Sequence, residues 1–268
     1  MGQGAGVLSS QGPLPTMAIT VEKVRFPSGG HTLRGRLYKP GGEGPHPGVV
    51  VCLGYPGDTK NMDLAEELAF KGIQALLFYY PGAWGSEGDY RLTRLPGSTL
   101  DALAWLGGLQ EVDEDRLAVA GHSMGALAVV NALALREGLR GGALVAPVAD
   151  LGPWLSGEAL EATHSLLVSM AQGKLELGDP QEFKEDLLRA TRQLNPVEAV
   201  ARAGQPLLFV VGSRDEVTPP DYCRALYEAA PGPKRWEVVE GADHGFSEHR
   251  HLLVGLVVDW LAGLLLDG

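Results

Sequence analysis

The segment GHSMG at residues 121–125 matches the pattern GxSxG, which is typical of a nucleophilic serine on a sharp turn. A buried strand, RLAVAG, is expected directly before this turn, and a helix from about Met124 to Arg136 directly after it. Such a turn holds its middle residue at positive φ, and it needs glycine two positions to either side because the backbones pass closely there. The pattern therefore predicts Ser123 as a nucleophile at a helix N-terminus, where backbone amides favour developing negative charge.

A serine hydroxyl needs a general base, and that base needs a carboxylate to orient it. Asp215 follows the expected strand PLLFVVG, and His244 follows the expected strand RWEVVE. Both loops come after the carboxyl ends of parallel strands, at the same edge as the turn of Ser123, so we expect the three side chains to meet. Asp150, just after the expected strand GALVAPV, is the alternative acid. We favour Asp215 because its loop faces the histidine loop more directly.

The other histidines and the cysteines show no spacing typical of metal ligands, so neither a metal site nor a cofactor is expected. His122 lies inside the serine turn, but adjacent residues point apart, and it is predicted to be a packing residue. The other histidines and cysteines without the spacing of metal ligands are His31, His46, His164, His249, His251, Cys52 and Cys223.

With these residues the chain resembles the α/β-hydrolase superfamily, in the branch of serine esterases similar to dienelactone hydrolases and prolyl-oligopeptidase-type catalytic domains. The matching segments are LGYPGDTKNM, GHSMG, GSRDEVTPP and GADHGF, and the resemblance covers nearly everything from Ile19 onward. It implies Ser123 as nucleophile, Asp215 as acid and His244 as base. Because dienelactone hydrolases carry cysteine at the turn, their own activity is not implied.

The resemblance also implies two hydrogen-bond donors for the oxyanion of a tetrahedral intermediate. One is the backbone N–H of Met124, and the other comes from Tyr55, in the loop after the third expected strand. The N–H of Tyr55 is our first expectation. Its hydroxyl is an alternative, because a tyrosine hydroxyl donates to the oxyanion in prolyl-oligopeptidase-type relatives. A third alternative is that Tyr55 only forms part of the pocket wall. The loop begins with Leu53-Gly54, where the family commonly has His-Gly.

Strand-like and helix-like segments alternate along the chain, which predicts βαβ crossovers and a mainly parallel sheet. Together with the resemblance, this gives an α/β-hydrolase fold with an eight-stranded sheet and helices on both faces, forming one domain over residues 19–268. Residues 1–18 lack the features of a secretory signal and are predicted to be a flexible tail, with Met17 as an alternative start. The expected helices are residues 61–71, 98–106, 124–136, 221–230 and a last one from about 248.

Residues from about 150 to 204 separate two neighbouring strands of this sheet and contain two amphipathic segments, ALEATHSLLVSMAQ and PQEFKEDLLRATRQL. A connection of this length predicts a small helical lid above the strand ends, with a crossover elaborated only for packing as the alternative. We expect an apolar acyl pocket beneath it, with Trp84 as a further wall. The expected lid contributors are Leu160, Leu166, Leu167 and Met170.

Composition limits the function classes. With 22 Lys+Arg against 33 Asp+Glu the formal charge is −11, and no run of basic residues is present, so a nucleic-acid partner is not expected. Two separated cysteines fit a reducing, cytoplasmic location. The apolar stretch from Leu252 to Leu266 contains Asp259 and is too short to span a bilayer.

The sequence thus predicts a hydrolase that cleaves a small-molecule ester or other acyl substrate through an acyl-enzyme. A peptidase or amidase, or a thioesterase, is compatible with the same three residues. A catalytically silent scaffold that binds a ligand is the alternative from another class. Exposed lid or edge-strand surface could support a homodimer, and the oligomeric state stays open.

Overall fold

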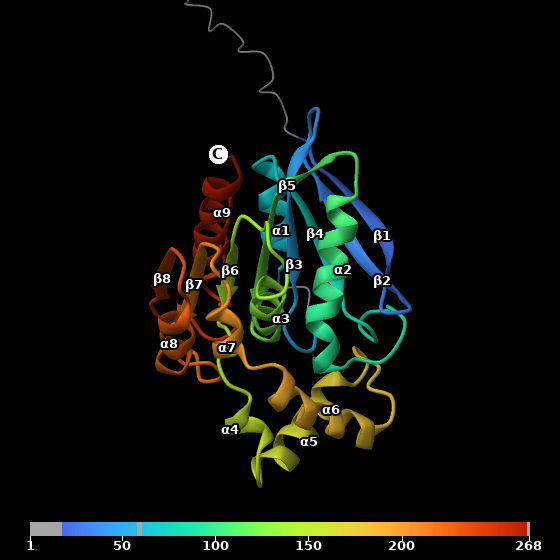
Figure 1. The fold of residues 1–268 in the computed structure, drawn as a ribbon, viewed down its shortest axis with the longest axis vertical. Helices are drawn as coiled ribbons and strands as arrows, with labels where there is room; N and C mark the ends of the chain where they lie inside the picture. The colour runs from blue at the N-terminus through green and yellow to red at the C-terminus, as the bar shows by residue number, and fades with distance from the viewer. Residues whose placement is uncertain (1–17, 58–60, 267–268) are drawn as a thin grey trace, which may run out of the picture.

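The computed structural model describes residues 18–57 and 61–266 and contains an eight-stranded sheet in the order β1-β2-β4-β3-β5-β6-β7-β8 (Figure 1). Strands β3 to β8 run parallel, while β2 pairs antiparallel with both β1 and β4. The predicted mainly parallel, eight-stranded sheet is therefore confirmed. The strands are β1 (Thr20–Ser28), β2 (His31–Lys39), β3 (His46–Cys52), β4 (Gln74–Tyr79), β5 (Val112–His122), β6 (Gly142–Val145), β7 (Leu207–Gly212) and β8 (Lys234–Val239).

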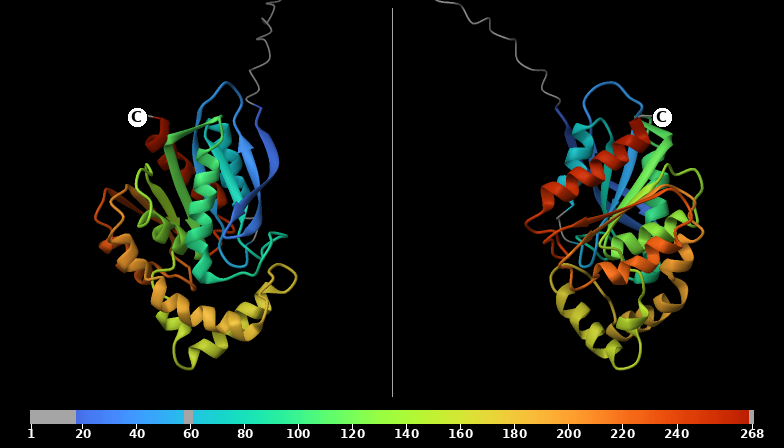
Figure 2. Two further views of the ribbon diagram at one scale, coloured as in Figure 1. Left: turned by 45° about the vertical axis from the view of Figure 1, so that its right-hand side comes forward. Right: turned by 90° about the vertical axis from the view of Figure 1, so that its left-hand side faces the viewer.

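Helices cover both faces of the sheet, as predicted. Helices α1 and α9 pack together on one face, and α2, α3 and α8 lie on the other (Figures 1 and 2). The central strands are buried on both sides, which explains their continuous apolar runs such as VVVC in β3 and LLFVVG in β7. The helices of the two layers are α1 (Met62–Phe70), α2 (Leu95–Gly107, preceded by the 3₁₀ turn η1, Leu92–Arg94), α3 (Met124–Leu133), α8 (Pro220–Ala229) and α9 (Arg250–Leu266).

Four helices lie between β6 and β7, where the sequence predicts a lid: α4 (Gly152–Leu155), α5 (Ala159–Ala171), α6 (Pro180–Gln193) and α7 (Pro196–Val200). The two predicted amphipathic segments form α5 and α6, whereas the short α4 and α7 were not expected from the pattern. In Figure 2 the yellow and gold segments lie below the carboxyl ends of the parallel strands. Asp179 caps α6 by accepting hydrogen bonds from the N–H groups of Gln181 and Glu182.

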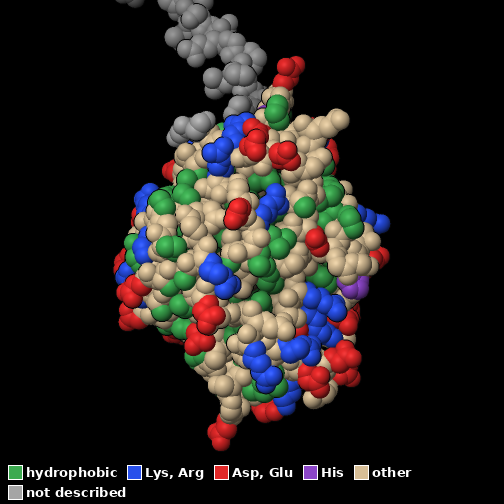
Figure 3. All heavy atoms as spheres, in the orientation of Figure 1, with side chains coloured by type: hydrophobic (Ala, Val, Ile, Leu, Met, Phe, Trp, Pro, Cys, Tyr) green, Lys and Arg blue, Asp and Glu red, His purple; other side chains and the backbone are tan. Residues whose placement is uncertain are grey.

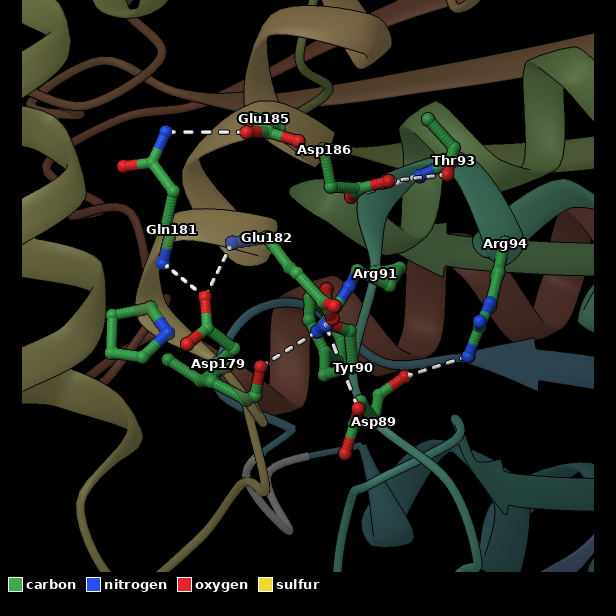
Figure 4. A network of polar contacts seen from close by, with 12 residues as sticks. Asp89, Tyr90, Arg91, Thr93, Arg94, Asp179, Gln181, Glu182, Glu185 and Asp186 are labelled. Carbon is green, nitrogen blue, oxygen red and sulfur yellow. Dashed lines mark hydrogen bonds and ion pairs between the residues drawn. The ribbon is translucent and has the colours of Figure 1, made fainter.

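Helix α6 is fixed to the body of the protein by a polar network with the loop that follows β4 (Figure 4). Arg91, only 5% exposed, donates to the carbonyl of Leu177 at 2.7 Å and pairs with Glu182 at 3.2 Å. The hydroxyl of Thr93 donates at 2.5 Å to the carboxylate of Asp186, which is fully buried. Because buried charge is costly to leave unpaired, these contacts hold α6 in one position.

Acidic and basic side chains both occur over the lower part of the face seen in Figure 3, where α6 lies.

The predicted helix over residues 124–136 ends earlier, at Leu133. Among the described residues, no helix has the length and hydrophobicity needed to cross a membrane. The predicted N-terminal tail lies outside the described residues as far as residue 17.

Candidate active site

Ser123 stands at the turn from β5 into α3 with a φ of +55°, the positive value expected from its sequence pattern. Its own N–H donates to the carbonyl of Val145 in the neighbouring strand at 2.9 Å, which fixes the turn. A side chain at Gly125 would overlap the carbonyl oxygen of Cys52, and one at Gly121 would overlap that of Gly125. Both glycines are therefore required by close backbone approach, and the turn presents the serine hydroxyl at the edge of the sheet.

His244 lies between Ser123 and Asp215. Its Nε2 is 3.0 Å from the Ser123 hydroxyl oxygen, and its Nδ1 is 2.8 Å from Oδ2 of Asp215. A carboxylate only accepts hydrogen bonds, so Nδ1 carries the proton and Nε2 offers its lone pair to the serine hydroxyl. The structure thus brings the three residues together in the arrangement that lets a serine lose its proton to histidine.

The Asp215 carboxylate is held from several directions. Its Oδ1 accepts the N–H groups of Val217 and Thr218, each at 2.8 Å, and the Thr218 hydroxyl lies 2.9 Å from Oδ2. Burial alone raises the pKa of this carboxyl group, but the hydrogen bonds from His244 and Thr218 outweigh it and leave the pKa below its ordinary value. Asp215 is therefore a fixed, ionised acceptor for the imidazole.

Asp150, the alternative acid, lies apart from this arrangement. Its backbone N–H and carbonyl contact the hydroxyl of Tyr222, and its side chain accepts the N–H of Gly152 at 2.8 Å. Its carboxylate thus stabilises the turn into α4, and Asp215 is the carboxylate in contact with His244.

His122 does more than the packing expected of it. It is buried, and its Nε2 lies 2.8 Å from the backbone carbonyl oxygen of His244. Since a carbonyl only accepts, His122 donates from Nε2 and holds the backbone of the His244 loop. The two rings lie with centroids 5.2 Å apart. Asp243 also supports this loop, because its carboxylate accepts the N–H of Ser247 at 2.8 Å.

On the other side of Ser123 lies the loop after β3. A side chain at Gly54 would come within 3.2 Å of the Ser123 Cβ, so this loop passes directly against the serine. The N–H groups of Tyr55 and Met124 have no hydrogen-bond partner in the described part of the chain. The Tyr55 hydroxyl instead donates at 2.5 Å to the carbonyl of Leu167 in α5, and burial raises its pKa.

A cavity of about 260 Å³ opens at Ser123 and His244 and extends beneath α4 and α5. Leu166, Leu167 and Met170 line it, in agreement with the sequence-based expectation. Leu160 packs in the core instead. Residues not anticipated from the sequence complete the wall: Leu92, Trp154, Leu155, Thr163 and Val217.

The expectation that Trp84 lines this pocket is wrong. Trp84 borders a different hollow, on the outer strands, together with Tyr79 and Arg34. After β4 the chain passes through Trp84 at a φ of +48°, and the Trp84 ring lies against Tyr79 at the end of β4, with ring centroids 6.2 Å apart.

No cluster of three or more His, Cys, Asp or Glu side chains is placed to hold a metal ion within residues 18–57 and 61–266. Cys52 and Cys223 are both buried, unpaired thiols.

Thr218 holds the Asp215 carboxylate and is a residue that the sequence did not lead us to expect at the site. Its position three residues after Asp215, where a carboxylate commonly accepts a backbone N–H, is the signal that could have identified it.

Comparisons with known proteins show what the chain is similar to. The model of the prolyl oligopeptidase family matches residues 98–265, more than half of the chain. An uncharacterised protein of Mycobacterium tuberculosis, Rv2307c, is 28% identical over 251 residues, covering 89% of this chain and 79% of its own.

Two solved structures illustrate the likeness in fold. Est1E from Butyrivibrio proteoclasticus, solved with ferulic acid bound, is similar with a TM-score of 0.76 and 19% identity, over 91% of this chain and 100% of its own. An acetyl xylan esterase from Paenibacillus sp. R4 is similar with a TM-score of 0.69 and 19% identity, over 91% of this chain and 85% of its own. The overall fold is the α/β-hydrolase fold, as the sequence resemblance implied.

Proposed function

Because the chain belongs to the prolyl oligopeptidase family, a family with the α/β-hydrolase fold, we propose that it is a serine hydrolase that cleaves carboxylic esters through an acyl-enzyme. The observation that carries the proposal is the continuous hydrogen-bond path from Asp215 through His244 to Ser123. In this proposal Ser123 is the nucleophile, His244 the general base and acid, and Asp215 the carboxylate that orients it.

The Ser123 oxygen attacks the ester carbonyl carbon while its proton moves to Nε2 of His244. Asp215 stabilises the imidazolium that forms, and its fixed position keeps Nδ1 protonated throughout. When the tetrahedral intermediate collapses, the bond to the alkoxy oxygen breaks and His244 gives the proton to the leaving alcohol. A water molecule then repeats both steps on the acyl-serine and releases the carboxylic acid.

The N–H groups of Met124 and Tyr55 are the proposed donors to the oxyanion. Met124 begins α3, so its N–H also carries the positive end of the helix dipole. The hydroxyl of Tyr55 is already engaged by the carbonyl of Leu167, which favours the backbone N–H over the hydroxyl as the second donor.

The mostly apolar lining of the cavity favours an uncharged acyl group as the substrate's acyl part. Leucines, Val217 and Trp154 dominate its wall, and of the residues lining it only His244 and Tyr55 have a side chain that ionises. At about 260 Å³ it lies just below the usual range of ligand pockets, which favours a small or medium acyl group. Residues 150–204 would act as the lid of this pocket within a single domain, and the name of the acetyl xylan esterase neighbour supports an ester substrate.

The family match favours a second candidate, hydrolysis of a small peptide or amide on the same three residues. Comparing p-nitrophenyl esters from acetate to palmitate with an aminoacyl anilide distinguishes the two. We expect esters of short to medium acyl chains to be cleaved fastest. Faster cleavage of the anilide than of every ester would overturn the esterase proposal in favour of the amidase.

A fluorophosphonate probe tests whether the site is catalytic at all. We expect labelling of the wild-type chain and none of Ser123→Ala, with Ser156→Ala, an exposed serine on the lid, as the matched control. Absence of both labelling and turnover in the folded wild-type chain would identify a silent scaffold.

A further inference from the structure

The antiparallel register of the outer hairpin gathers basic side chains that are separated in the sequence. Lys23 of β1 lies directly opposite Arg36 of β2, and Arg25 lies directly opposite Arg34. Opposed residues in an antiparallel pair project to the same face, so four cations share one face of the hairpin. No basic run is visible along the chain, yet the fold creates a basic cluster in space.

These four side chains border a hollow of about 300 Å³, here called the basic hollow, which Tyr79 and Trp84 also line. The two rings lie with centroids 6.2 Å apart, and Trp84 is 42% exposed. Exposed aromatic rings beside cationic side chains are the combination that binds flat, negatively charged molecules, because the ring stacks while the cations neutralise phosphate.

The charges of the basic hollow are not paired with carboxylates in the part of the chain that the structure describes. None of the four cations forms an ion pair or side-chain hydrogen bond with a described residue. The exposed carboxylate of Glu87 interacts electrostatically with Arg25, but its direct contact is with the N–H of Thr32 at 2.7 Å, and it forms no ion pair with Arg25. Like charges placed directly opposite each other destabilise a hairpin, so the cluster has no explanation in stability.

We propose that the basic hollow binds a small phosphorylated molecule with a flat ring, of the nucleoside diphosphate class. Arg25, Arg34, Arg36 and Lys23 would contact the phosphates, and Trp84 would stack on the ring. The concave shape and its volume, at the small end of ligand sites, fit such a molecule better than the flat surface of a membrane.

This site is distinct from the proposed catalytic cavity, since the two share no lining residue. Trp84 nevertheless lies next to the loop after β3, because a side chain at Gly57 would come within 3.4 Å of its indole nitrogen. Binding and ester hydrolysis can therefore be measured separately on the same protein.

Calorimetric titration of the full-length chain with ADP, inorganic pyrophosphate and adenosine tests the proposal. We expect saturable 1:1 binding of ADP, weaker binding of pyrophosphate, and still weaker binding of adenosine. The double variant Arg25→Gln/Arg34→Gln should weaken ADP binding at least about tenfold, because each substitution removes a charge-assisted hydrogen bond to the phosphates. Arg202→Gln, which removes an exposed arginine after α7, is the matched control and should leave binding unchanged.

Trp84→Ala should weaken the binding of ADP without changing that of pyrophosphate. The double variant should be at least as stable to heat as the wild type, because it removes cross-strand repulsion, so lost binding cannot be attributed to unfolding.

The proposal is overturned if ADP and pyrophosphate fail to bind at millimolar concentration, or if the double variant binds ADP as the wild type does. Flotation with phosphatidylserine vesicles distinguishes a soluble phosphorylated molecule from a membrane lipid as the source of the phosphate. Vesicle binding that the double variant loses, without any binding of ADP, would show a membrane surface to be the ligand and would also overturn it.

Discussion

The hydroxyl of Tyr55 donates a hydrogen bond of 2.5 Å to the backbone carbonyl of Leu167 and thereby ties the loop beside Ser123 to helix α5. This contact joins segments 112 residues apart in the chain. It connects the proposed oxyanion donor to the wall of the acyl pocket, so the position of α5 and the geometry at the serine depend on each other.

Tyr55→Phe separates the two possible roles of this residue. The backbone N–H remains, so we expect kcat for p-nitrophenyl esters to fall less than about tenfold, with a larger rise in KM because α5 is held less firmly. Loss of an oxyanion donor typically lowers kcat by about 10²–10³. A fall of that size in steady-state kinetics would mean that the hydroxyl, rather than the N–H, contacts the oxyanion.

His122→Phe tests whether the contact with the His244 carbonyl positions the base. The variant keeps a buried ring but leaves that carbonyl without its donor, which should lower kcat about tenfold while KM changes little. His122→Gln, whose amide can donate to the same carbonyl, should recover part of the lost rate. Equal losses in both variants, or a loss confined to stability, would assign His122 a packing role only.

Asp215 should make stability depend on pH. Its pKa in the folded protein lies below the ordinary value of about 4 in the unfolded chain. The stabilisation is therefore fully present above pH 4 and is lost as the pH falls through the lower, folded-state pKa.

Chemical denaturation of the wild type and Asp215→Asn should show this. The difference in free energy of unfolding should be larger at pH 7 than at pH 3. Asp221→Asn, at an exposed position in the first turn of α8, provides the control. A difference independent of pH would contradict the assigned cause of the shift.

The two cysteines should be inert in the folded protein. Burial raises the pKa of Cys52 to about 11 and that of Cys223 to about 12. At pH 8 about one thiol in a thousand or fewer is then ionised, so Ellman's reagent should report no fast-reacting thiol until denaturant is added. Rapid reaction in the native state would show that one of these sites opens to solvent.

Much of the site followed from local patterns. The turn at Ser123 was predictable because its backbone conformation depends on the two nearby glycines and on the strand and helix that flank it. Asp215 and His244 were predictable as candidates because each follows a strand recognisable by its own apolar run. The strands and the longer helices were recognisable for the same reason, since their periodicity reports burial on one or both faces.

The remaining features depend on which loops and strands become neighbours. Asp215 and Asp150 both follow parallel strands and the sequence only favours the first, whereas the packing of their loops brings Asp215 into contact with His244. Trp84 was assigned to the wrong pocket because its ring packs against Tyr79 and borders the hollow of the outer strands, a contact that the local sequence does not reveal. The cations of β1 and β2 form a cluster only through the register of the hairpin. Local sequence determines the conformation of a segment, whereas contacts between distant segments depend on the free energy of packing the whole chain, which short-range patterns do not contain.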